Sequence, residues 1–293
     1  MNRNLANLGI VVAILLFVIA CVCPAGRDKG NSSTPTSSPT PSQTKSNSTP
    51  TNDNKTSPNK DEGDFKVEHS AAKSSKYTDL EKEIKDEKLL ENAAAQLNKA
   101  LALPENITLK VEECGEPNAF YDGNDVTITM CYELMEHFYL TFRSTGMQDQ
   151  KAYGKMFAAT RFVFLHEVGH ALIDQYKLPV TGNEEDSADR LSAFINLEEL
   201  GNEGVEACFA GADAFKISSK MAKTTSADMA DEHLLDEQRS FNSLCMIYGS
   251  NSVKYANILT DGYLPKARAE RCEQEYQRMS ESWANLLKPW RKA

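Results

Sequence analysis

Residues 162–172 read Phe-Val-Phe-Leu-His-Glu-Val-Gly-His-Ala-Leu, and this stretch decides how the rest of the chain is interpreted. Its apolar residues predict a helix buried in a domain core. His166 and His170 are four residues apart, so they lie on one face of that helix, with Glu167 one step round it. Two imidazoles placed in this way can bind one zinc ion, and the glutamate can accept a proton from a water on that metal.

Two simpler interpretations of this motif stay open. Three fixed positions can match by chance on an ordinary amphipathic helix, and two histidines can be hydrogen-bonded residues of a core. Burying two imidazoles and a carboxylate is costly, however, unless they are paired or coordinate a metal. Gly169 lowers helix propensity, which suits close approach of another backbone. We therefore predict a metal site on a helix that ends near Lys177-Leu178-Pro179.

A third ligand is expected downstream, because zinc enzymes usually combine three protein ligands with a water. Thr181-Gly182-Asn183 indicates a turn and a helix cap before an acidic segment. Glu185 and Asp189 are four residues apart in that segment, with the small Ala188 between them, so they share a face that can approach a neighbouring helix. We predict that Glu185 is the third ligand.

The carboxylates around Glu185 have other predicted roles. Asp189 is expected to accept a hydrogen bond from the free ring nitrogen of a ligand histidine and so to fix its tautomer. Glu184 and Asp186 are expected only to complement the helix dipole, as acids in a first turn do. Either of them remains an alternative to Glu185 as the ligand.

These residues carry a resemblance to a known class of enzymes. The segment 166–170, followed by Glu185 and by Ala188-Asp189, resembles the gluzincin pattern of thermolysin-like and CAAX-prenyl-protease-like metallopeptidases. In that pattern, the glutamate of an E-x-x-x-D or E-x-x-A-D segment is the third zinc ligand. The interval from His170 to Glu185 is shorter here than in many gluzincins.

The chain from about Tyr77 onward is similar to a bacterial family of exported predicted metallopeptidases, first catalogued as a domain of unknown function. The family implies a peptidase-like fold but no substrate. The matching segments, in order, are Cys114-Gly115, Asn118-Ala119-Phe120-Tyr121, Cys131-Tyr132-Glu133-Leu134, the segments 166–170 and 184–189, His233 with Asp236-Glu237-Gln238-Arg239, Cys245 with Ile247-Tyr248-Gly249, Leu264-Pro265 and Arg271-Cys272-Glu273-Gln274-Glu275-Tyr276.

The start of the chain indicates export. Arg3 precedes an apolar stretch, Leu8 to Ala20, that is short for a membrane span, so residues 1–23 are predicted to be a signal peptide. Val18-Ile19-Ala20-Cys21 resembles a bacterial lipobox, in which the cysteine carries the lipid. We expect an exported protein of the cell envelope, anchored to the membrane through Cys21. Ordinary cleavage near Ala20 or Ala25, or an uncleaved anchor, are the alternatives.

Residues 24–75 are rich in Ser, Thr, Pro, Asn and Lys and almost lack large apolar side chains, which predicts a disordered tether before a domain at 76–293. The net charge of −10 and a pI of about 5.1 argue against a nucleic-acid partner, since no basic stripe offsets them. We expect a monomer that acts on a peptide or protein substrate.

The cysteines fit an oxidising compartment. Of the seven, Cys114 and Cys131 flank a predicted hairpin, and Cys245 and Cys272 bracket a C-terminal segment, so we predict two disulfides, one within each pair. Cys208 is predicted to be a small buried core residue.

The expected fold is α+β and zincin-like, with a small N-terminal sheet packed on the motif helix and a mostly helical C-terminal half. Thr78 to Glu81 indicates a capping box, followed by helix to about Leu101. Strands are predicted at 107–113 and 126–131, and a helix over 131–142. In zincin-like folds an edge strand above the metal pairs with an extended peptide, and either 118–121 or 126–130 is expected to supply it.

The predicted reaction is hydrolysis of a peptide bond, with one zinc ion as cofactor and Glu167 as general base. The oxyanion needs a second donor. His233 is the leading candidate, because thermolysin-like enzymes use a downstream histidine; Tyr248, Tyr263 and Arg239 are the others. An exposed histidine without a catalytic role is the simpler interpretation of His233, and Arg239 is expected to pair with a nearby acid.

Three functions from different classes fit the sequence. The first is an active zinc peptidase tethered to the cell envelope. The second is a catalytically inactive zincin-like domain that binds peptides or envelope proteins through the same cleft. The third is an envelope interaction protein whose motif helix is purely structural. Metal content separates the third from the others, and a peptidase assay with Glu167→Gln as control separates the first from the second.

Overall fold

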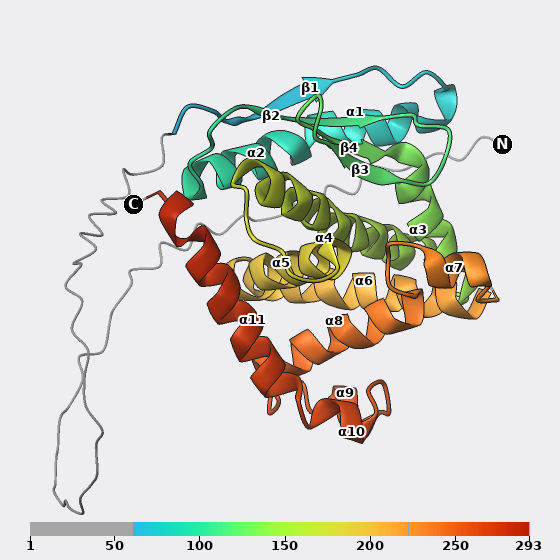
Figure 1. The fold of residues 1–293 in the computed structure, drawn as a ribbon. Helices are drawn as coiled ribbons and strands as arrows, with labels where there is room; N and C mark the ends of the chain where they lie inside the picture. Colours follow the sequence, from blue (N-terminus) through green and yellow to red (C-terminus); the bar gives the residue numbers. More distant parts are fainter. Residues whose placement is uncertain (1–60, 222, 293) are drawn as a thin grey trace, which may run out of the picture. The chain divides into compact units, whose positions relative to one another are not determined.

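The structure is a computed structural model that describes residues 61–221 and 223–292. It confirms the predicted α+β class, with a small sheet toward the N-terminal side and a mostly helical C-terminal half (Figure 1). The elements are β1 (Phe65–His69), η1 (Ser75–Tyr77), α1 (Thr78–Asp86), α2 (Leu89–Ala100), β2 (Ile107–Glu112), β3 (Ala119–Asp122), β4 (Thr127–Cys131), α3 (Tyr132–Ser144), α4 (Asp149–Gln175), α5 (Glu184–Glu199), α6 (Gly201–Met221), α7 (Ser226–Ala230), α8 (Asp236–Ser250), α9 (Asn257–Thr260), α10 (Lys266–Ala269), α11 (Cys272–Leu287) and η2 (Lys288–Trp290).

The sheet has the strand order β1-β2-β4-β3, in which β1, β2 and β4 are parallel and β3 runs antiparallel to β4. In β2, Ile107, Leu109 and Val111 are buried and the residues between them are half-buried, so one face of the sheet is covered by helices. Tyr121 of β3 points to that covered face, since its hydroxyl donates a hydrogen bond to Asp174 of α4 over 2.7 Å. Of the two segments expected to form the edge strand, the structure selects the first.

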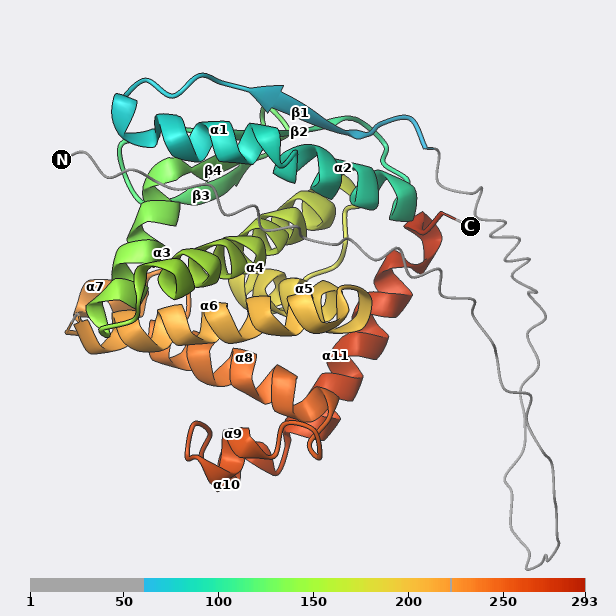
Figure 2. The same ribbon diagram turned by 180° about the vertical axis from the view of Figure 1, so that it is seen from behind.

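Helix α4, which carries the histidines, is central. It packs against α3, α5 and α6 and against strands β3 and β4. In both ribbon views the sheet lies on one side of α4, and α6 and α8 lie on the other (Figures 1 and 2). Phe162, Val168 and Leu172 of α4 are fully buried, as the apolar sequence around the motif predicts. The helix ends at Gln175, and Lys177 follows with a φ of 49°, so the end predicted near Lys177 is confirmed.

Helices α4 and α5 approach each other most closely at Gly169 and Ala188. A Cβ atom built on Gly169 would lie 2.9 Å from the Cα atom of Ala188 and 3.1 Å from its Cβ. Only a glycine therefore allows the two backbones to come this near, which is the use predicted for Gly169. The contact brings the first turn of α5 alongside the histidine face of α4.

The predicted boundary of the tether at residue 75 is wrong for its last part. Residues 61–75 belong to the folded domain: β1 pairs with β2, Phe65 is 2% exposed, and the backbone N–H of Gly63 donates to the carbonyl of Leu103 over 2.9 Å. Only Phe65 and Val67 of β1 are covered, and the polar residues around them made this short strand hard to recognise in the sequence. Residues 1–60, and with them the predicted signal peptide, Cys21 and most of the tether, lie outside the described residues.

The helix predicted from Thr78 to Leu101 is divided in two. Lys88, with a φ of 53°, separates α1 from α2. The predicted capping box at Thr78 is also wrong, because η1 runs directly into α1 and leaves no cap there. Glu81 instead accepts a hydrogen bond from the backbone N–H of Ala72 over 2.9 Å.

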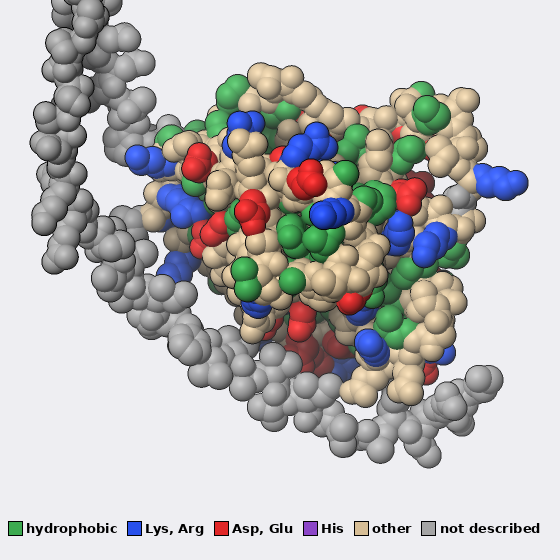
Figure 3. Space-filling model, turned by 90° about the horizontal axis from the view of Figure 1, so that it is seen from below, with side chains coloured by type: hydrophobic (Ala, Val, Ile, Leu, Met, Phe, Trp, Pro, Cys, Tyr) green, Lys and Arg blue, Asp and Glu red, His purple; other side chains and the backbone are tan. Residues whose placement is uncertain are grey.

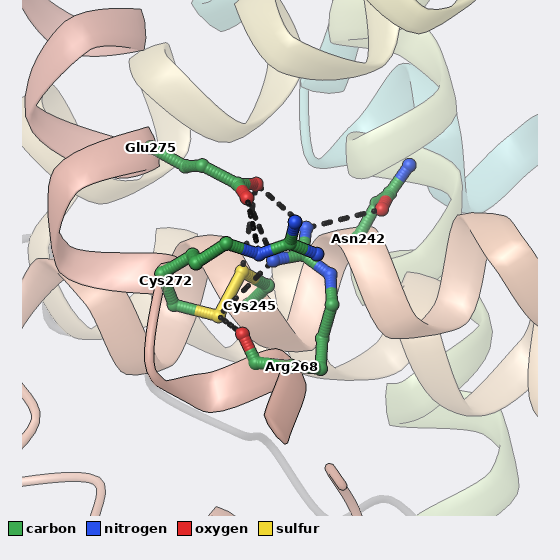
Figure 4. The surroundings of a disulfide bond; sticks show 6 residues. Asn242, Cys245, Arg268, Cys272 and Glu275 are labelled. Carbon is green, nitrogen blue, oxygen red and sulfur yellow. Dashed lines mark hydrogen bonds and ion pairs between the residues drawn. A yellow bond between two sulfur atoms is a disulfide. The ribbon is translucent and has the colours of Figure 1, made fainter. Parts of the chain in front are cut away.

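Both predicted disulfides are confirmed. Cys114–Cys131 joins the chain after β2 to the end of β4, and Cys245–Cys272 joins α8 to the start of α11. Beside the second bridge, Arg268 binds Glu275 through both oxygens, at 3.0 and 2.7 Å (Figure 4). Cys208 is a buried free thiol, as predicted.

Charged side chains of both signs are intermixed on the face near α9 and α10 (Figure 3). That face therefore carries no large area of one sign. Within residues 61–221 and 223–292, no helix has the combination of length and apolarity that spanning a membrane requires.

Candidate metal centre

The two motif histidines converge from consecutive turns of α4. His166 is 3% exposed and His170 is 15% exposed at the side chain, and their Nε2 atoms lie 3.1 Å apart. This approach follows from the helix, which places residues four apart on one face. Both rings therefore point the same nitrogen at the same small region.

Glu185 reaches that region from α5. The side chain of Asn183 caps the helix by accepting a hydrogen bond from the backbone N–H of Asp186 over 3.0 Å, which fixes the first turn. Glu185 then places Oε2 at 3.1 Å from Nε2 of His166 and Oε1 at 3.3 Å from Nε2 of His170. Two imidazoles and one carboxylate from two neighbouring helices thus surround one point.

Two more carboxylates hold the opposite nitrogens of these rings. Asp189 Oδ1 lies 2.8 Å from Nδ1 of His166, and Glu184 Oε1 lies 2.8 Å from Nδ1 of His170. Each contact favours the tautomer with the proton on Nδ1, which leaves a lone pair on Nε2. The prediction that Glu184 only complements the helix dipole is therefore wrong, because its side chain contacts His170.

His233 joins this cluster from the segment between α7 and α8. Its Nε2 atom lies 3.0 Å from Oε2 of Glu185, and its Nδ1 atom lies 2.9 Å from Oδ1 of Asp231. The side chain is 44% exposed, so it stands at the open side of the site. The imidazole of His233 is thus arranged like those of His166 and His170. A carboxylate contacts its Nδ1 atom, and its Nε2 atom faces the carboxylate of Glu185.

Arg239 of α8 neutralises Asp189. Its Nε and Nη2 atoms donate hydrogen bonds to the two carboxylate oxygens of Asp189, both over 2.8 Å, and its guanidinium stacks over the ring of Phe215 at 4.1 Å. The predicted ion pair of Arg239 with a nearby acid is confirmed. The guanidinium lies behind His166 and keeps the buried Asp189 ionised.

The electrostatics of the cluster follow from these contacts. Burial opposes ionisation of Glu185, but the three imidazoles next to its carboxylate outweigh this effect and hold the pKa of Glu185 far below its usual range. Burial disfavours the charged form of His170, yet Glu185 and Glu184 raise its pKa to about 9. The nearby carboxylate of Glu185 likewise raises the pKa of His233 to about 9, against burial. Protons and a cation would compete for the same lone pairs.

The geometry fits a metal ion better than a hydrogen-bonded cluster. Oε2 of Glu185 is buried and has no hydrogen-bond partner, although two imidazole nitrogens lie within 3.1 Å of it. Ligands at about 2.0–2.1 Å from one tetrahedral zinc are separated by roughly 3.3–3.4 Å, close to the spacings seen here. A set of imidazole nitrogens with one carboxylate is a donor set that zinc accepts.

Glu167 lies beside this point but turns toward a cavity. It is 5% exposed, and burial raises the pKa of its carboxyl, opposed by His166 and His170 and by a hydrogen bond from the backbone N–H of Tyr121 in β3. A carboxyl with a raised pKa next to a metal is suited to accept and return a proton. The bond to Tyr121 also ties Glu167 to the edge strand.

The cavity on this side of the cluster has a volume of about 230 Å³. It is bounded by the segment before β3, by helices α3, α4 and α6, and by the start of α8, so distant parts of the sequence meet there. Its lining residues are Pro117, Asn118, Ala119, Leu134, His137, Phe138, Val163, His166, Glu167, Ala214, Phe215, Ser218, His233, Asp236 and Arg239.

The structure thus brings Glu167 and His233 together with His166, His170 and Glu185, and it leaves two of the other oxyanion candidates aside. Tyr248 and Tyr263 do not line the cavity, and Tyr263 is 56% exposed. The sequence interpretation missed the contact of Asp231 with His233. The signal available for it was an acid two residues before a histidine, which is common in loops and weak on its own.

Comparison with known proteins identifies a family for this chain. The model of a family described as "Putative metallopeptidase" matches residues 69–287, which is well over half of the chain. No curated protein and no solved structure matches.

Proposed function

Because the chain belongs to the family described as "Putative metallopeptidase", we propose that it is a zinc-dependent peptidase whose site is built by His166, His170 and Glu185. One observation carries the proposal. Three ligand-type side chains from α4 and α5 converge within 3.1–3.3 Å of one another, while the Nδ1 atoms of both imidazoles are held by carboxylates. In the neutral rings, that arrangement leaves the lone pairs of both Nε2 atoms facing inward.

A zinc ion bound by these three residues would act as a Lewis acid and lower the pKa of a water that it binds. Glu167 lies next to the ligands and accepts the proton of the attacking water, then donates it to the leaving amine. His233 stands at the open side and donates a hydrogen bond from Nε2 to the oxyanion that develops on the substrate carbonyl. Asp231 orients His233 through its Nδ1 atom.

The free edge of strand β3 can bind the backbone of a substrate next to Glu167. β3 pairs with β4 on one side only, and the bond from Tyr121 to Glu167 brings its edge next to the proton acceptor. An extended peptide that adds to β3 as a further strand would run past Glu167 with one side chain in the cavity. This supports cleavage of an extended segment of a peptide or an unfolded protein.

The experiment that tests the function is a peptidase assay on diverse peptides with the full-length protein, zinc-loaded, and with Glu167→Gln. The substitution removes the proton acceptor and leaves the three ligands, so we expect zinc content to stay at one ion per chain while activity falls at least ~1,000-fold. If the wild type and Glu167→Gln bind zinc and are equally inert, the chain is a metal-holding domain that binds peptides and does not cut them.

We propose further that the enzyme works outside the cytoplasm, held to the membrane by lipid on Cys21. The apolar segment before Cys21 and the two disulfides of the domain support export to an oxidising compartment. The polar residues between Cys21 and the domain would let it stand clear of the membrane surface.

A further inference from the structure

The cavity beside Glu167 is sized for a single side chain. Its volume of about 230 Å³ is below the roughly 300–1,000 Å³ of pockets that take drug-sized ligands. Its walls include Leu134 and Phe138 from α3, Val163 from α4 and Phe215 from α6. These apolar surfaces suit the hydrocarbon part of a substrate side chain.

One carboxylate in the cavity has no partner among the described residues. Asp236, the first residue of α8, lines the cavity half-buried, and neither a hydrogen bond nor an ion pair joins its side chain to the rest of residues 61–221 and 223–292. The other acids nearby are engaged: Asp189 by Arg239, Glu185 by imidazoles, and Glu237 by Lys216 over 2.8 Å. A partly desolvated carboxylate without a partner gains most from a cation that enters the cavity.

The charged groups around Asp236 do not supply that cation. Arg239 lies on the same helix as Asp236 and acts on it electrostatically, but its guanidinium already donates hydrogen bonds to both oxygens of Asp189. His233 is held between Asp231 and Glu185, and Asp228 on α7 adds negative charge. His137 of α3 lines the same cavity without a hydrogen bond to Asp236. Glu167 adds a second carboxylate to the lining.

We propose that Asp236 makes this cavity selective for a substrate residue with a long apolar stem and a positively charged end, lysine or arginine, beside the bond to be cleaved. The inference rests on the proposed peptidase function, because only a peptidase has a bond to cleave. Recognition of the side chain itself is a binding property of the cavity and can be measured without cleavage. The stem would contact Leu134, Phe138 and Val163, and the charged end would reach Asp236.

The test compares three blocked peptides that are identical except at one position, which carries lysine, norleucine or glutamate. Norleucine keeps the length of the lysine stem and lacks the charge. Binding is measured by calorimetry on full-length, zinc-loaded Glu167→Gln protein, and cleavage on the wild type. We expect the lysine peptide to bind and to be cleaved at least about tenfold better than the norleucine peptide, as for a hydrogen bond between charged groups.

Asp236→Asn, in either background, should reduce that preference to less than about twofold. Glu237→Gln is the matched control, because its carboxylate is adjacent on α8, is paired with Lys216 and does not line the cavity; it should keep the full preference. Zinc content and melting temperature verify that both variants fold.

Equal binding of the lysine and norleucine peptides, tighter binding of the glutamate peptide, or a preference that survives Asp236→Asn would each overturn the proposal. The experiment separates failure of the peptidase function from failure of the cavity assignment. Lysine-selective binding that depends on Asp236, without cleavage by the wild type, would refute the peptidase function and support the cavity assignment. Cleavage without a preference for lysine would support the peptidase function and refute the cavity assignment.

Discussion

The ring nitrogens of His166 and His170 are oriented by carboxylates that never touch the proposed metal. Asp189 Oδ1 holds Nδ1 of His166 at 2.8 Å, and this carboxylate is itself held by Arg239. Replacing Asp189 with asparagine removes the charge and weakens control of the tautomer. We predict that the zinc affinity of Asp189→Asn, measured by competition with a chromogenic chelator, falls about 10–100-fold.

Asp186→Asn serves as the control for that substitution. Asp186 lies three residues before Asp189 on α5 but pairs with Arg190 over 2.7 Å and makes no contact with either motif histidine. Its variant should bind zinc within about threefold of wild type, since the substitution alters the ion pair with Arg190 and a hydrogen bond from Asn242 over 3.3 Å, and neither involves a motif histidine. A comparable loss of affinity in both variants would mean that the carboxylates near the start of α5 act in general, and that the bond of Asp189 to His166 has no particular role.

The raised pKa values of the imidazoles predict a pH dependence of zinc binding. His170 and His233 have pKa values of about 9 in the metal-free protein, so at pH 7 both imidazoles carry a second proton and are positively charged. Zinc must displace the proton of any imidazole that it binds. The apparent affinity should therefore rise by about tenfold per pH unit, for each proton displaced, from pH 6 until it levels off near pH 9. An affinity that stays constant over this range would contradict the protonation assigned to the cluster.

At the scale of helices, the site depends on how closely α4 and α5 approach each other. Gly169→Ala places a methyl group 2.9 Å from the Cα atom of Ala188, so the helices must separate. We predict a loss of about 1–3 kcal/mol in the free energy of unfolding, measured by denaturant titration of the metal-free protein. Zinc affinity should fall as well, because Glu185 moves with α5.

Gly154→Ala on the same helix is the control. A Cβ at Gly154 meets no atom within 4 Å, so the substitution adds helix propensity without a clash. It should leave stability unchanged or raise it by up to about 1 kcal/mol. If Gly169→Ala were equally harmless, the close contact between α4 and α5 would not be needed to position Glu185.

The parts of the site that the sequence predicted depend on spacing within one helix. His166 and His170 are one turn apart, and Glu185 and Asp189 are one turn apart, so each pair could be assigned to a face before the fold was known. The sequence shows that Gly169 and Ala188 are small residues, but only the structure shows that they are in direct contact. Glu184 was misjudged, because whether a side chain in a first turn meets another helix depends on the crossing of α4 and α5.

Other features could not be reached from local patterns. β1 has two covered apolar residues among charged ones, so its pairing with β2 across intervening helices is a long-range property. The break at Lys88 divides a continuous helical pattern without a proline or glycine to mark it. The cavity near Asp236 collects residues from 117 to 239, and no spacing rule relates them.

At the scale of the whole molecule, the proposed attachment to the membrane depends on a single residue, Cys21. Cys21→Ala should release the protein from the membrane fraction of cells into the soluble extracytoplasmic fraction, because a cysteine is needed to carry the lipid. Cys23→Ala is the matched control, two residues farther along the chain, and should stay with the membrane. Retention of Cys21→Ala in the membrane would indicate an uncleaved anchor.

The central claim is that three side chains from α4 and α5 share one zinc ion, and diffraction from zinc-loaded crystals at the zinc absorption edge tests it most directly. The account predicts one anomalous peak per chain, about 2.0–2.2 Å from Nε2 of His166, Nε2 of His170 and a carboxylate oxygen of Glu185. A peak elsewhere in the domain, or one at the two histidines with Glu185 turned away and no other acid in its place, would contradict it.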